Sequence, residues 1–409
     1  MSRTVPTIIA VTVAAAGLAA GVTLAGGQAP PPATTAPQGN AAATFTFTGR
    51  GWGHGVGMSQ YGARGRARAG WSTARILAAY YPGTRLSTAR QRTVRILLAS
   101  GRRAVAVRGA GAWRAVGGGR TVALRPGATY RMVSAGAAVE LRRGARRVMR
   151  VAGPIGVRAV ASGGVVSWGG GAGRAYRGVV SAVPRGGSLD VVNSVRLDDY
   201  LLGVVPREMP ADWGDDAPAA LRAQAIAARS YAIATMTPGA AYDVFDDDRS
   251  QVYGGRSAED PRTTRAVRST RGTVLTYDGA VITAFFFSTS GGRTEDVQNV
   301  FPGAAPRPYL VSVPDPFDHI SPYHVWTPPP SFTGARLGRL LGLGGPVAEV
   351  RILSRGRSPR VREALVITDS GRQVRFTGAR LRSALGLRDT WFSVTKTGGT
   401  PVAPAPVAE

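Results

Sequence analysis

The chain has 409 residues, of which 51 are basic and 24 acidic, so its formal net charge is +27. This length allows two or three domains with hydrophobic cores of their own. The chain contains no cysteine, which excludes disulfides, zinc thiolates and thiol nucleophiles. Its positive charge, carried by arginine at every basic position except Lys396, favours a polyanionic surrounding: nucleic acid, anionic lipid or an anionic cell-wall polymer.

The N-terminal residues have the pattern of an export signal. Arg3 is followed by an apolar run from Ile8 to Ala25 and then by small residues, which is typical of a secretory signal peptide. A run of about 18 residues is also long enough for one membrane anchor. We expect residues 1–27 to be a signal peptide or anchor and residues 28–43 to be a disordered Pro/Ala/Thr linker. Both interpretations place the protein outside the cytoplasm, secreted or in the cell envelope, and argue against nucleic acid as its physiological partner.

The alternating segment 43–48 predicts a strand. It leads into GRGWGHGVGMSQ, where five glycines occupy every second position of Gly49–Gly57. In an extended chain Trp52 and His54 would point to one side, opposite bare backbone, so another backbone or a flat ligand is expected to approach closely. A flexible glycine loop is the alternative. The spacing does not fit a dinucleotide-binding loop, and a short helix is expected over residues 72–80.

Residues 91–195 are predicted to form a β-rich module, because short apolar strands alternate there with glycine-rich turns. Within it, residues 101–150 carry twelve arginines and the single acid Glu140. We expect these arginines to face solvent. Two interpretations stay open: an ordinary solvated surface, or a surface that grips an anionic polymer.

The segment Leu197–Met236 predicts two helices that meet at a proline-rich joint. Pro206 is expected to end the first helix. Asp216 is a suitable N-cap for the second helix, with Pro218 in its first turn.

Glu208 lies at this joint, beside Met209 and close to Trp213, and is the only glutamate of the segment. An apolar corner disfavours the charged carboxylate, so the pKa of the group rises from about 4.3 towards neutrality. A general acid needs such a pKa. The alternative is a surface glutamate in a turn.

The C-terminal half is expected to mix strands and helices. Residues 246–248 are three aspartates that predict a turn, because the spacing of a calcium-binding EF-hand is absent. Strands at 273–277 and 280–287 lead into the polar loop 288–296, a common position for site residues. Beyond it the sequence predicts a helix near 335–343, strands near 348–353 and 363–376, and a last helix that ends in Trp391–Val394.

Three kinds of chemistry are compatible with these residues. A serine hydrolase would use Ser288 or Ser290, but no G-x-S-x-G elbow occurs. A two-carboxylate glycosidase would pair Glu208 with an aspartate or with Glu295. A single-acid mechanism needs only Glu208, provided that a hydroxyl of the substrate sugar is the nucleophile. Three scattered histidines and the absence of H-E-x-x-H argue against a metal site.

Several segments carry a family resemblance: LDDYLLGVVPREMPADW with ALRAQAIAARSYA, SQVYGG, RGTVLTYDG, FFFSTSGGRTEDVQNVF, PYLVSVPDP, and GRGWGHGVGMSQYGA with ILAAYYPGT. They resemble the SpoIID/LytB family of bacterial cell-wall proteins, named for stage II sporulation protein D and an amidase enhancer. The resemblance covers most of residues 45–90 and 190–395, with a looser match through the β-rich module.

The resemblance implies a lytic transglycosylase that acts on peptidoglycan glycan strands stripped of their stem peptides. Such an enzyme cleaves the MurNAc–GlcNAc bond and leaves a 1,6-anhydro sugar, with Glu208 as the single catalytic acid and base. It implies no cofactor. The residues expected to contact the substrate are Trp52, His54, Gln60, Gln224, Arg229, Gln251, Ser288, Ser290 and Arg293.

Two features depart from the family pattern. The sporulation enzymes carry cysteines and a histidine that can hold zinc where this chain has Phe245, Arg249 and Ser250, so we expect no zinc here. The family usually places the glycine/histidine segment near its C-terminus, after a segment like 390–394, whereas here it comes first. We infer a circular permutation, which requires strand 44–48 to lie beside segment 390–394.

The expected fold is therefore α+β, with a β-rich mixed core, a helical pair that carries the active-site glutamate, and an inserted all-β module. The catalytic core would comprise residues 196–395 together with the permuted segment 44–90, and residues 396–409 would be a disordered tail. Glycan strands are the expected partner, and a cell-wall amidase is a second candidate. The alternative function is a non-catalytic amidase enhancer that binds peptidoglycan.

Overall fold

The computed structural model describes residues 43–161, 164–169, 174–237 and 239–399. The predicted export signal or anchor, almost all of the predicted linker and most of the predicted C-terminal tail lie outside these residues. Across the described ranges, no helix has the length and apolar character needed to cross a membrane. The chain divides into two compact units. In the described ranges, unit 1 is Gly57–Phe286, and unit 2 combines residues 43–56 with residues 287–399.

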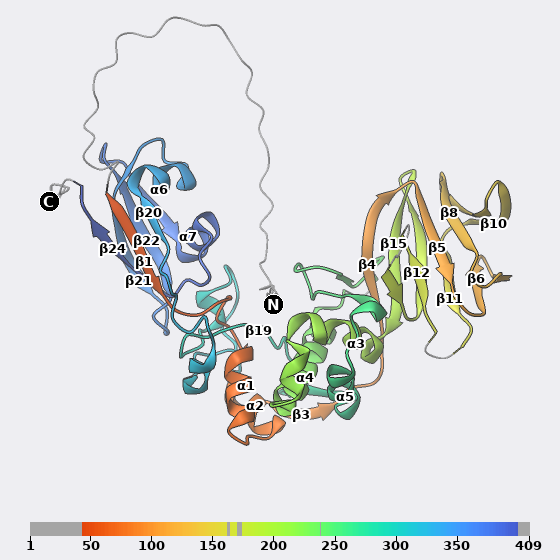
Figure 1. Cartoon of the computed structure of the whole chain (residues 1–409), viewed down its shortest axis with the longest axis horizontal. Helices are drawn as coiled ribbons and strands as arrows, with labels where there is room; N and C mark the ends of the chain where they lie inside the picture. The colour runs from red at the N-terminus through yellow and green to blue at the C-terminus, as the bar shows by residue number, and fades with distance from the viewer. Residues whose placement is uncertain (1–42, 162–163, 170–173, 238, 400–409) are drawn as a thin grey trace, which may run out of the picture. The chain divides into compact units, whose positions relative to one another are not determined.

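The fold is α+β and rich in strands, as the sequence predicted. In unit 1 the strands expected between residues 94 and 195 are present and form two sheets that pack together (Figure 1). One sheet has the strand order β16-β4-β15-β14-β11-β6-β7 and the other β10-β9-β8-β5-β12-β13. The strands are β4 (Thr93–Arg102), β5 (Ala104–Gly109), β6 (Trp113–Gly117), β7 (Arg120–Leu124), β8 (Thr129–Ala135), β9 (Ala138–Arg143), β10 (Arg146–Ala152), β11 (Ile155–Ala159), β12 (Val166–Trp168), β13 (Arg174–Tyr176), β14 (Val179–Arg185), β15 (Ser188–Arg196) and β16 (Val244–Phe245).

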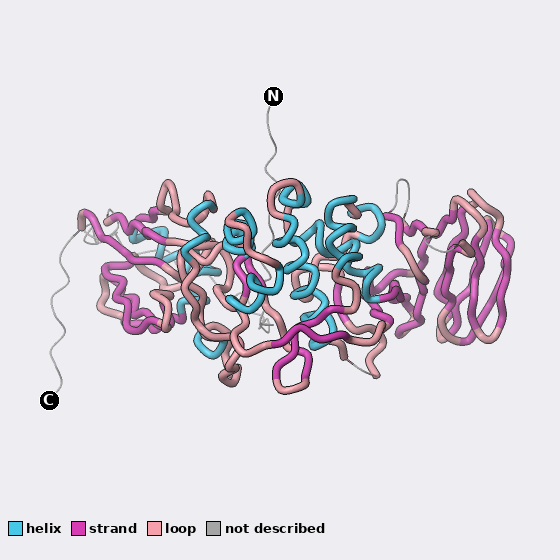
Figure 2. Tube along the Cα trace, turned by 90° about the horizontal axis from the view of Figure 1, so that it is seen from below, coloured by secondary structure: helices cyan, strands magenta, loops and turns pink. Residues whose placement is uncertain are grey.

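The helices of unit 1 gather together at one side of these sheets (Figure 2). They are α1 (Gln60–Arg68), α2 (Thr73–Tyr80), α3 (Leu197–Glu208), α4 (Pro218–Thr235) and α5 (Pro261–Ser269). A further sheet of order β18-β17-β3 accompanies them, formed by β3 (Arg85–Thr88), β17 (Thr273–Tyr277) and β18 (Ala280–Val281). Helix α4 is buried along most of its length, because its many alanines allow α1, α3 and α5 to approach closely.

The helical pair differs from the prediction at both of its inner ends. Pro206 does not end α3, which continues to Glu208, because the N–H of Met209 still donates to the carbonyl of Val205 (3.0 Å). A proline in the last turn removes one backbone hydrogen bond but does not end the helix. Asp216 does not cap α4: the N-cap is Ala217, and Asp216 instead forms an ion pair with Arg64 (2.8 Å).

Unit 2 places its first strand beside its last one. Strand β1 (Thr44–Gly49) lies between β20 (Ser331–Thr333) and β24 (Phe392–Thr397), antiparallel to both. In this register Phe47 is opposite Val394 and Thr48 is opposite Ser393. The neighbourhood of strand 44–48 and segment 390–394 is thus confirmed, and it is the arrangement that a circular permutation requires.

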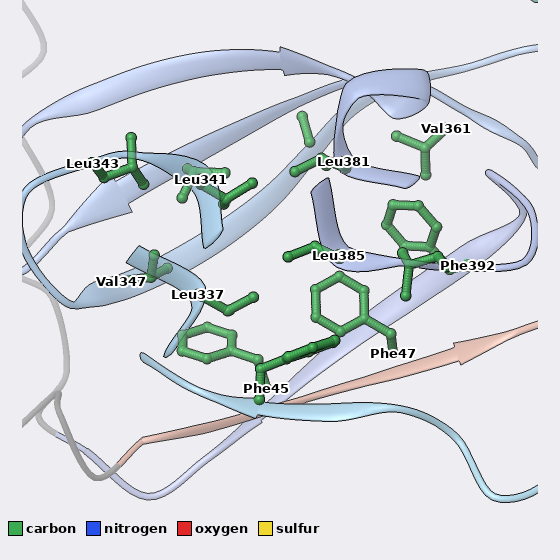
Figure 3. Packing of buried hydrophobic residues seen from close by; sticks show 14 of the residues in the cluster. Phe45, Phe47, Leu337, Leu341, Leu343, Val347, Val361, Leu381, Leu385 and Phe392 are labelled. Carbon is green, nitrogen blue, oxygen red and sulfur yellow. The ribbon is translucent and has the colours of Figure 1, made fainter. Parts of the chain in front are cut away.

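The hydrophobic core of unit 2 lies between this sheet, a second sheet and two helices (Figure 3). The second sheet has the order β21-β22-β23, with β21 (Val347–Arg355), β22 (Val361–Thr368) and β23 (Gln373–Thr377); the helices are α6 (Gly334–Leu341) and α7 (Gly378–Leu385). Phe45 and Phe47 of β1 and Phe392 of β24 enter this core.

Three expected elements of the C-terminal half were wrong. The single strand expected at 363–376 is the hairpin of β22 and β23, because the chain turns through Asp369–Gly371. The last helix ends at Leu385, and residues 392–397 form a strand instead. The strand expected over 280–287 is interrupted after Val281.

The two helices of unit 2 begin and end in the same way. Residues 332–343 read FTGARLGRLLGL and residues 376–387 read FTGARLRSALGL. In each copy the threonine hydroxyl accepts the N–H of the arginine three residues later, as an N-cap, and a left-handed glycine ends the helix. The same local sequence therefore builds the same capped helix twice.

The glycine run after β1 is not the extended strand that its alternation predicts. Gly51, Gly53, Gly55 and Gly57 all have positive φ, between 75° and 130°, a region that other residues rarely adopt. The close approach expected at this run comes from the protein itself. A Cβ atom on Gly51 would lie 2.7 Å from the carboxylate of Asp389, and one on Gly53 would lie 2.7 Å from Cβ of Phe287.

A buried ion pair occupies the space that the run leaves open. Arg360 donates through Nε and Nη2 to the two carboxylate oxygens of Asp389 (both 2.9 Å), and both side chains are almost fully buried. Arg360 also donates to the carbonyls of Ser290 (2.8 Å) and Arg293 (2.7 Å). Gly55 packs directly on the Arg360 guanidinium, so a side chain there would collide with it.

We predict that Gly55→Ala destabilises unit 2 far more than Gly371→Ala. Both glycines have φ near +80°, but a Cβ at Gly371 meets nothing within 4 Å. The control should cost about 1 kcal/mol, the backbone strain alone, and Gly55→Ala about 2 kcal/mol more, from overpacking against Arg360. Urea unfolding of both variants measures the difference, and equal losses would contradict the packing role of Gly55.

Candidate active site

Glu208 is the last residue of α3, and its side chain is 4% exposed. Its Oε1 accepts a hydrogen bond from the backbone N–H of Val252 (3.0 Å), in the loop that follows β16. Among the described residues no hydrogen bond reaches Oε2, and Oε2 is not one of the fully enclosed polar atoms. The carboxyl group is therefore held by one oxygen while the other remains available to a reacting group.

Burial raises the pKa of the Glu208 carboxyl from 4.5 to about 7. The Val252 hydrogen bond and the charge of Arg207 act in the opposite direction and are weaker. Burial disfavours the carboxylate because the surrounding protein solvates its charge less well than water does. A carboxyl with a pKa near 7 holds and releases a proton under neutral conditions, which general acid–base chemistry requires.

Two glutamine side chains support the end of α3 from neighbouring helices. Gln60, the first residue of α1, donates through Nε2 to the backbone carbonyl of Glu208 (2.9 Å) and lies 3.4 Å from Oε1 of Gln224 on α4. Gln60 Oε1 and Gln224 Nε2 are buried without a hydrogen-bond partner among the described residues. Such atoms are rare in folded proteins and are usually satisfied by ordered water or by a ligand.

A third glutamine joins the loop that holds Glu208 to Tyr200. Gln251 immediately precedes Val252, accepts a hydrogen bond from the hydroxyl of Tyr200 (3.4 Å) and donates to the carbonyl of Ala228 (3.4 Å). Burial raises the pKa of Tyr200 and of Tyr231, and the negative charge of Glu208 raises both further. Both phenols therefore remain neutral hydrogen-bonding groups beside the carboxyl.

A cavity of about 650 Å³ lies in unit 1 beside the loop that holds Glu208, although Glu208 itself is not part of its wall. Val252, whose N–H holds Glu208, is part of its wall, as are Pro206 and Arg207 of α3. This volume lies within the range of about 300–1,000 Å³ that is typical of ligand sites. The remaining wall residues are Arg174, Asp246, Asp247, Asp248, Tyr253, Gly254, Ser257 and Ala258.

Arg229, although expected at the site, is engaged elsewhere. Its buried guanidinium donates to Asp198 at the start of α3 (3.0 Å) and to the carbonyls of Thr273 (3.0 Å) and Val267 (3.3 Å). These bonds tie α4 to α3, α5 and β17. The structure thus brings Gln60, Gln224 and Gln251 around Glu208 but gives Arg229 a structural position.

The other expected substrate-binding residues belong to unit 2. Trp52 pairs through its backbone with Thr289, and its ring meets that of Tyr323 edge to face (4.3 Å between centroids). His54 is 7% exposed and lies against Phe287 and Phe301. Its Nδ1 accepts the N–H of Val56 (3.0 Å), so a neutral ring carries its proton on Nε2.

A fully buried aspartate, Asp318, holds the backbone of the loop that carries Ser288, Ser290 and Arg293. Asp318 accepts the N–H groups of Ser290 and Gly291 (both 2.9 Å), and its Oδ2 lies 3.0 Å from Nδ1 of His324. The hydroxyl of Ser290 accepts the N–H of Gly292 (3.1 Å). Among the described residues no hydrogen bond joins Ser290 to a histidine, so the geometry does not favour Ser290 as the nucleophile of a serine hydrolase.

Arg293, the third expected contact of this loop, donates through Nε to the hydroxyl of Ser312 (2.9 Å).

Glu295, the expected partner of Glu208 in a two-carboxylate mechanism, has its hydrogen-bonding capacity filled by other groups. It accepts the backbone N–H groups of Asp296, Arg357 and Ser358, the side-chain amide of Asn299 and the hydroxyl of Ser358. A carboxylate held by so many donors is a poor nucleophile or base, which argues against this alternative.

Phe245, Arg249 and Ser250, the positions where the family resemblance implies metal ligands in other members, have other partners here. Arg249 lies over the ring of Phe245 (3.7 Å) and forms an ion pair with Asp247 (2.8 Å), and the Ser250 hydroxyl accepts the N–H of Phe245 (3.1 Å). Within the described ranges, no group of three His, Cys, Asp or Glu side chains is arranged to hold a metal ion.

Comparison with known sequences supports the family resemblance. Residues 185–277, which include α3, Glu208 and α4, match the family model described as SpoIID, stage II sporulation protein. The resemblance to the SpoIID/LytB family read from the sequence is thus confirmed for this part of the chain.

Individual relatives cover different parts of the chain. The stage II sporulation protein D of Bacillus subtilis is 35% identical over 228 residues, 51% of this chain and 63% of the relative. That of Bacillus amyloliquefaciens is 33% identical over the same shares. The amidase enhancer of Bacillus subtilis is 42% identical over 127 residues, 31% of this chain and 16% of the relative. The chain thus spans 63% of the length of the two sporulation relatives, and no solved structure matches it.

Several residues around the carboxyl had not been identified from the sequence. Tyr200 and Tyr231 resemble ordinary aromatic residues of a helix core, and Val252 contributes only a backbone N–H. None of the three carries a signal in the sequence. In unit 2, Asp318, which holds the Ser290 loop, was also not identified, because it lies in a proline-rich segment where periodicity is uninformative. The polar S-Q-V-Y segment was the one signal that pointed to the loop at Val252.

We predict that Glu208→Gln stabilises the protein at alkaline pH and not at acidic pH. The pKa of Glu208 is raised on folding, so unfolding becomes easier as pH rises from about 4.5 to about 7 and the unfolded chain ionises first. Glutamine keeps an oxygen for Val252 and has no such penalty. The gain in free energy of unfolding should be on the order of 3 kcal/mol at pH 8 and near zero at pH 4.

Urea unfolding at both pH values measures this gain, with the exposed Glu363→Gln as a control that should change neither value. A gain for Glu208→Gln that is the same at both pH values would show that the carboxyl is not perturbed by burial.

Proposed function

We propose that this protein is an exported peptidoglycan-remodelling enzyme, a lytic transglycosylase in which Glu208 is the only catalytic acid and base. The observation that carries the proposal is the Glu208 carboxyl itself, buried, with a pKa of about 7 and one oxygen that no described residue engages. Similarity to stage II sporulation protein D and to an amidase enhancer supports a role in the cell wall.

The reaction begins with protonated Glu208. Oε2–H gives its proton to the oxygen that links MurNAc C1 to the next GlcNAc, and the C1–O bond breaks with its electron pair on that oxygen. The C6 hydroxyl of the same MurNAc then attacks C1. Its proton passes to the Glu208 carboxylate, which restores the enzyme and leaves a 1,6-anhydro ring. No water is consumed and no second carboxylate is needed.

The surroundings of Glu208 suit a group that exchanges one proton twice. Val252 holds Oε1 and fixes the orientation of the carboxyl, while Tyr200 and Tyr231 are neutral at the pH at which Glu208 titrates. The unsatisfied amide atoms of Gln60 and Gln224 are available to polar groups of a bound sugar or to ordered water. Trp52, His54, Ser288, Ser290 and Arg293 remain proposed substrate contacts on unit 2.

The second candidate function is a non-catalytic amidase enhancer that binds glycan strands and stimulates a cell-wall amidase. The 42% identity to the amidase enhancer over 127 residues supports this second candidate function. The two proposals differ in one product, the 1,6-anhydro end, which only the enzyme makes.

We predict that the purified protein releases 1,6-anhydro ends from glycan strands and that Glu208→Gln lowers this rate at least about 10³-fold. Denuded and peptide-bearing strands are both offered, and the products are identified by mass spectrometry. Glu363→Gln is the control and should keep full activity, because Glu363 is exposed. Binding of strands to Glu208→Gln is measured in parallel. Binding without anhydro ends in the wild-type protein would favour the enhancer.

We also predict a pH profile set by Glu208. The group must be protonated to start the reaction, so kcat/KM should fall about tenfold per pH unit above about pH 7, the pKa that burial produces. Strand binding to Glu208→Gln, measured over the same range, should not show this fall. A rate that stays level to pH 9 would exclude Glu208 as the acid.

A further inference from the structure

The outer surface of one sheet of the β-rich module carries five arginines, here called the arginine face: Arg108, Arg131, Arg142, Arg147 and Arg150. Strand register places Arg131 on β8 opposite Arg142 on β9, and Arg142 opposite Arg147 on β10. Partners that face each other across strands share one side of a sheet. The alternate residues Val107, Met132, Leu141 and Met149 are buried on the inner side.

A buried glutamate organises three of these side chains. Glu140 on β9 accepts hydrogen bonds from Arg142 (2.8 and 2.6 Å), Arg147 (3.4 Å) and Arg150 (3.1 Å). The carboxylate lies beneath the guanidinium groups, which are themselves 42%, 58% and 53% exposed. Glu140 therefore pre-orders the arginines while their side chains remain about half exposed.

The arginine face has more positive charge than its own residues neutralise. Glu140 is the only acid between residues 101 and 150, so four of the five arginine charges remain uncompensated. Neighbouring strands lie about 4.8 Å apart, so the row Arg131, Arg142, Arg147 spans about 10 Å. Like charges at this spacing repel one another, and an anionic chain across the row would relieve the repulsion.

The rest of the face narrows the chemistry of its ligand. The residues between the arginines are small and not aromatic: Ala106, Thr129, Val133 and Ser167. Single-stranded nucleic acid binders use aromatic side chains on which bases stack, and none lies between the arginines among the residues that the structure describes. A six-stranded sheet is also too wide for a DNA major groove of about 12 Å. Guanidinium groups match phosphate oxygens in two-point hydrogen bonds.

We propose that the arginine face is a binding site for a linear polyol phosphate, an extended phosphodiester chain without bases. The site is separate from Glu208 and does not depend on the proposed catalytic function. It would hold the protein against a phosphate-bearing polymer through several guanidinium contacts, each weakened by salt.

The test uses the full protein and synthetic poly(glycerol phosphate), with affinity measured by calorimetry at several salt concentrations. Arg108→Gln/Arg131→Gln is the first variant, because neither arginine touches Glu140. It should bind at least about five-fold more weakly at 0.15 M salt and with a smaller salt dependence. A second variant, Glu140→Gln/Arg142→Gln/Arg147→Gln/Arg150→Gln, removes the organised cluster without leaving a buried unpaired carboxylate and should lose more.

The matched control is Arg362→Gln/Arg380→Gln on unit 2, which removes the same net charge as each variant from exposed positions. Circular dichroism confirms that all variants are folded. Weakening confined to the two arginine-face variants supports the site. Equal weakening in the control, or no measurable binding by the wild type, overturns it. Binding of poly-glutamate or single-stranded DNA as tightly as poly(glycerol phosphate) overturns the assignment to a polyol phosphate.

Discussion

The chemistry available to this protein depends on the desolvation of one carboxyl group. Glu208 ends α3 where that helix packs on α4, and the loop at Val252 covers one of its oxygens. Burial disfavours its charge more strongly than Val252 and Arg207 favour it, so its pKa rises to about 7. The packing that destabilises the fold at alkaline pH is the same packing that suits the group to proton transfer.

Unit 2 depends on a different buried charge arrangement. Arg360 and Asp389 form a bidentate pair in a closed environment, and Arg360 also binds two carbonyls of the loop that carries Ser290. A buried pair of this kind is costly to break because removal of one partner leaves the other charge unsolvated. Gly51, Gly53 and Gly55 are required because the ion pair and Phe287 occupy the space where their side chains would lie. Glu295 and Asp318 serve the same unit as acceptors of backbone N–H groups.

Local signals predicted a large part of the fold. The strands of the β-rich module follow from alternation, and the short helix expected over residues 72–80 is present as α2. Periodicity failed where other contacts decide the backbone. The glycine run adopts positive φ around a buried ion pair. Helix α3 continues past Pro206 because the N–H of Met209 still donates to the carbonyl of Val205. The repeated FTGARL segment, by contrast, forms the same capped helix at both positions.

The sequence by itself determined the resemblance to the SpoIID/LytB family and the α+β class, and it singled out Glu208 as the candidate catalytic carboxyl, because these depend on residue order and on short-range pattern. It also singled out the three glutamines that lie around Glu208. Only the tertiary structure decided that Arg229 serves α4 packing, that Glu295 is saturated, and that five arginines share one side of a sheet. Each of these depends on which distant segments meet, and strand register and helix packing are set by the whole core rather than by neighbours in the chain.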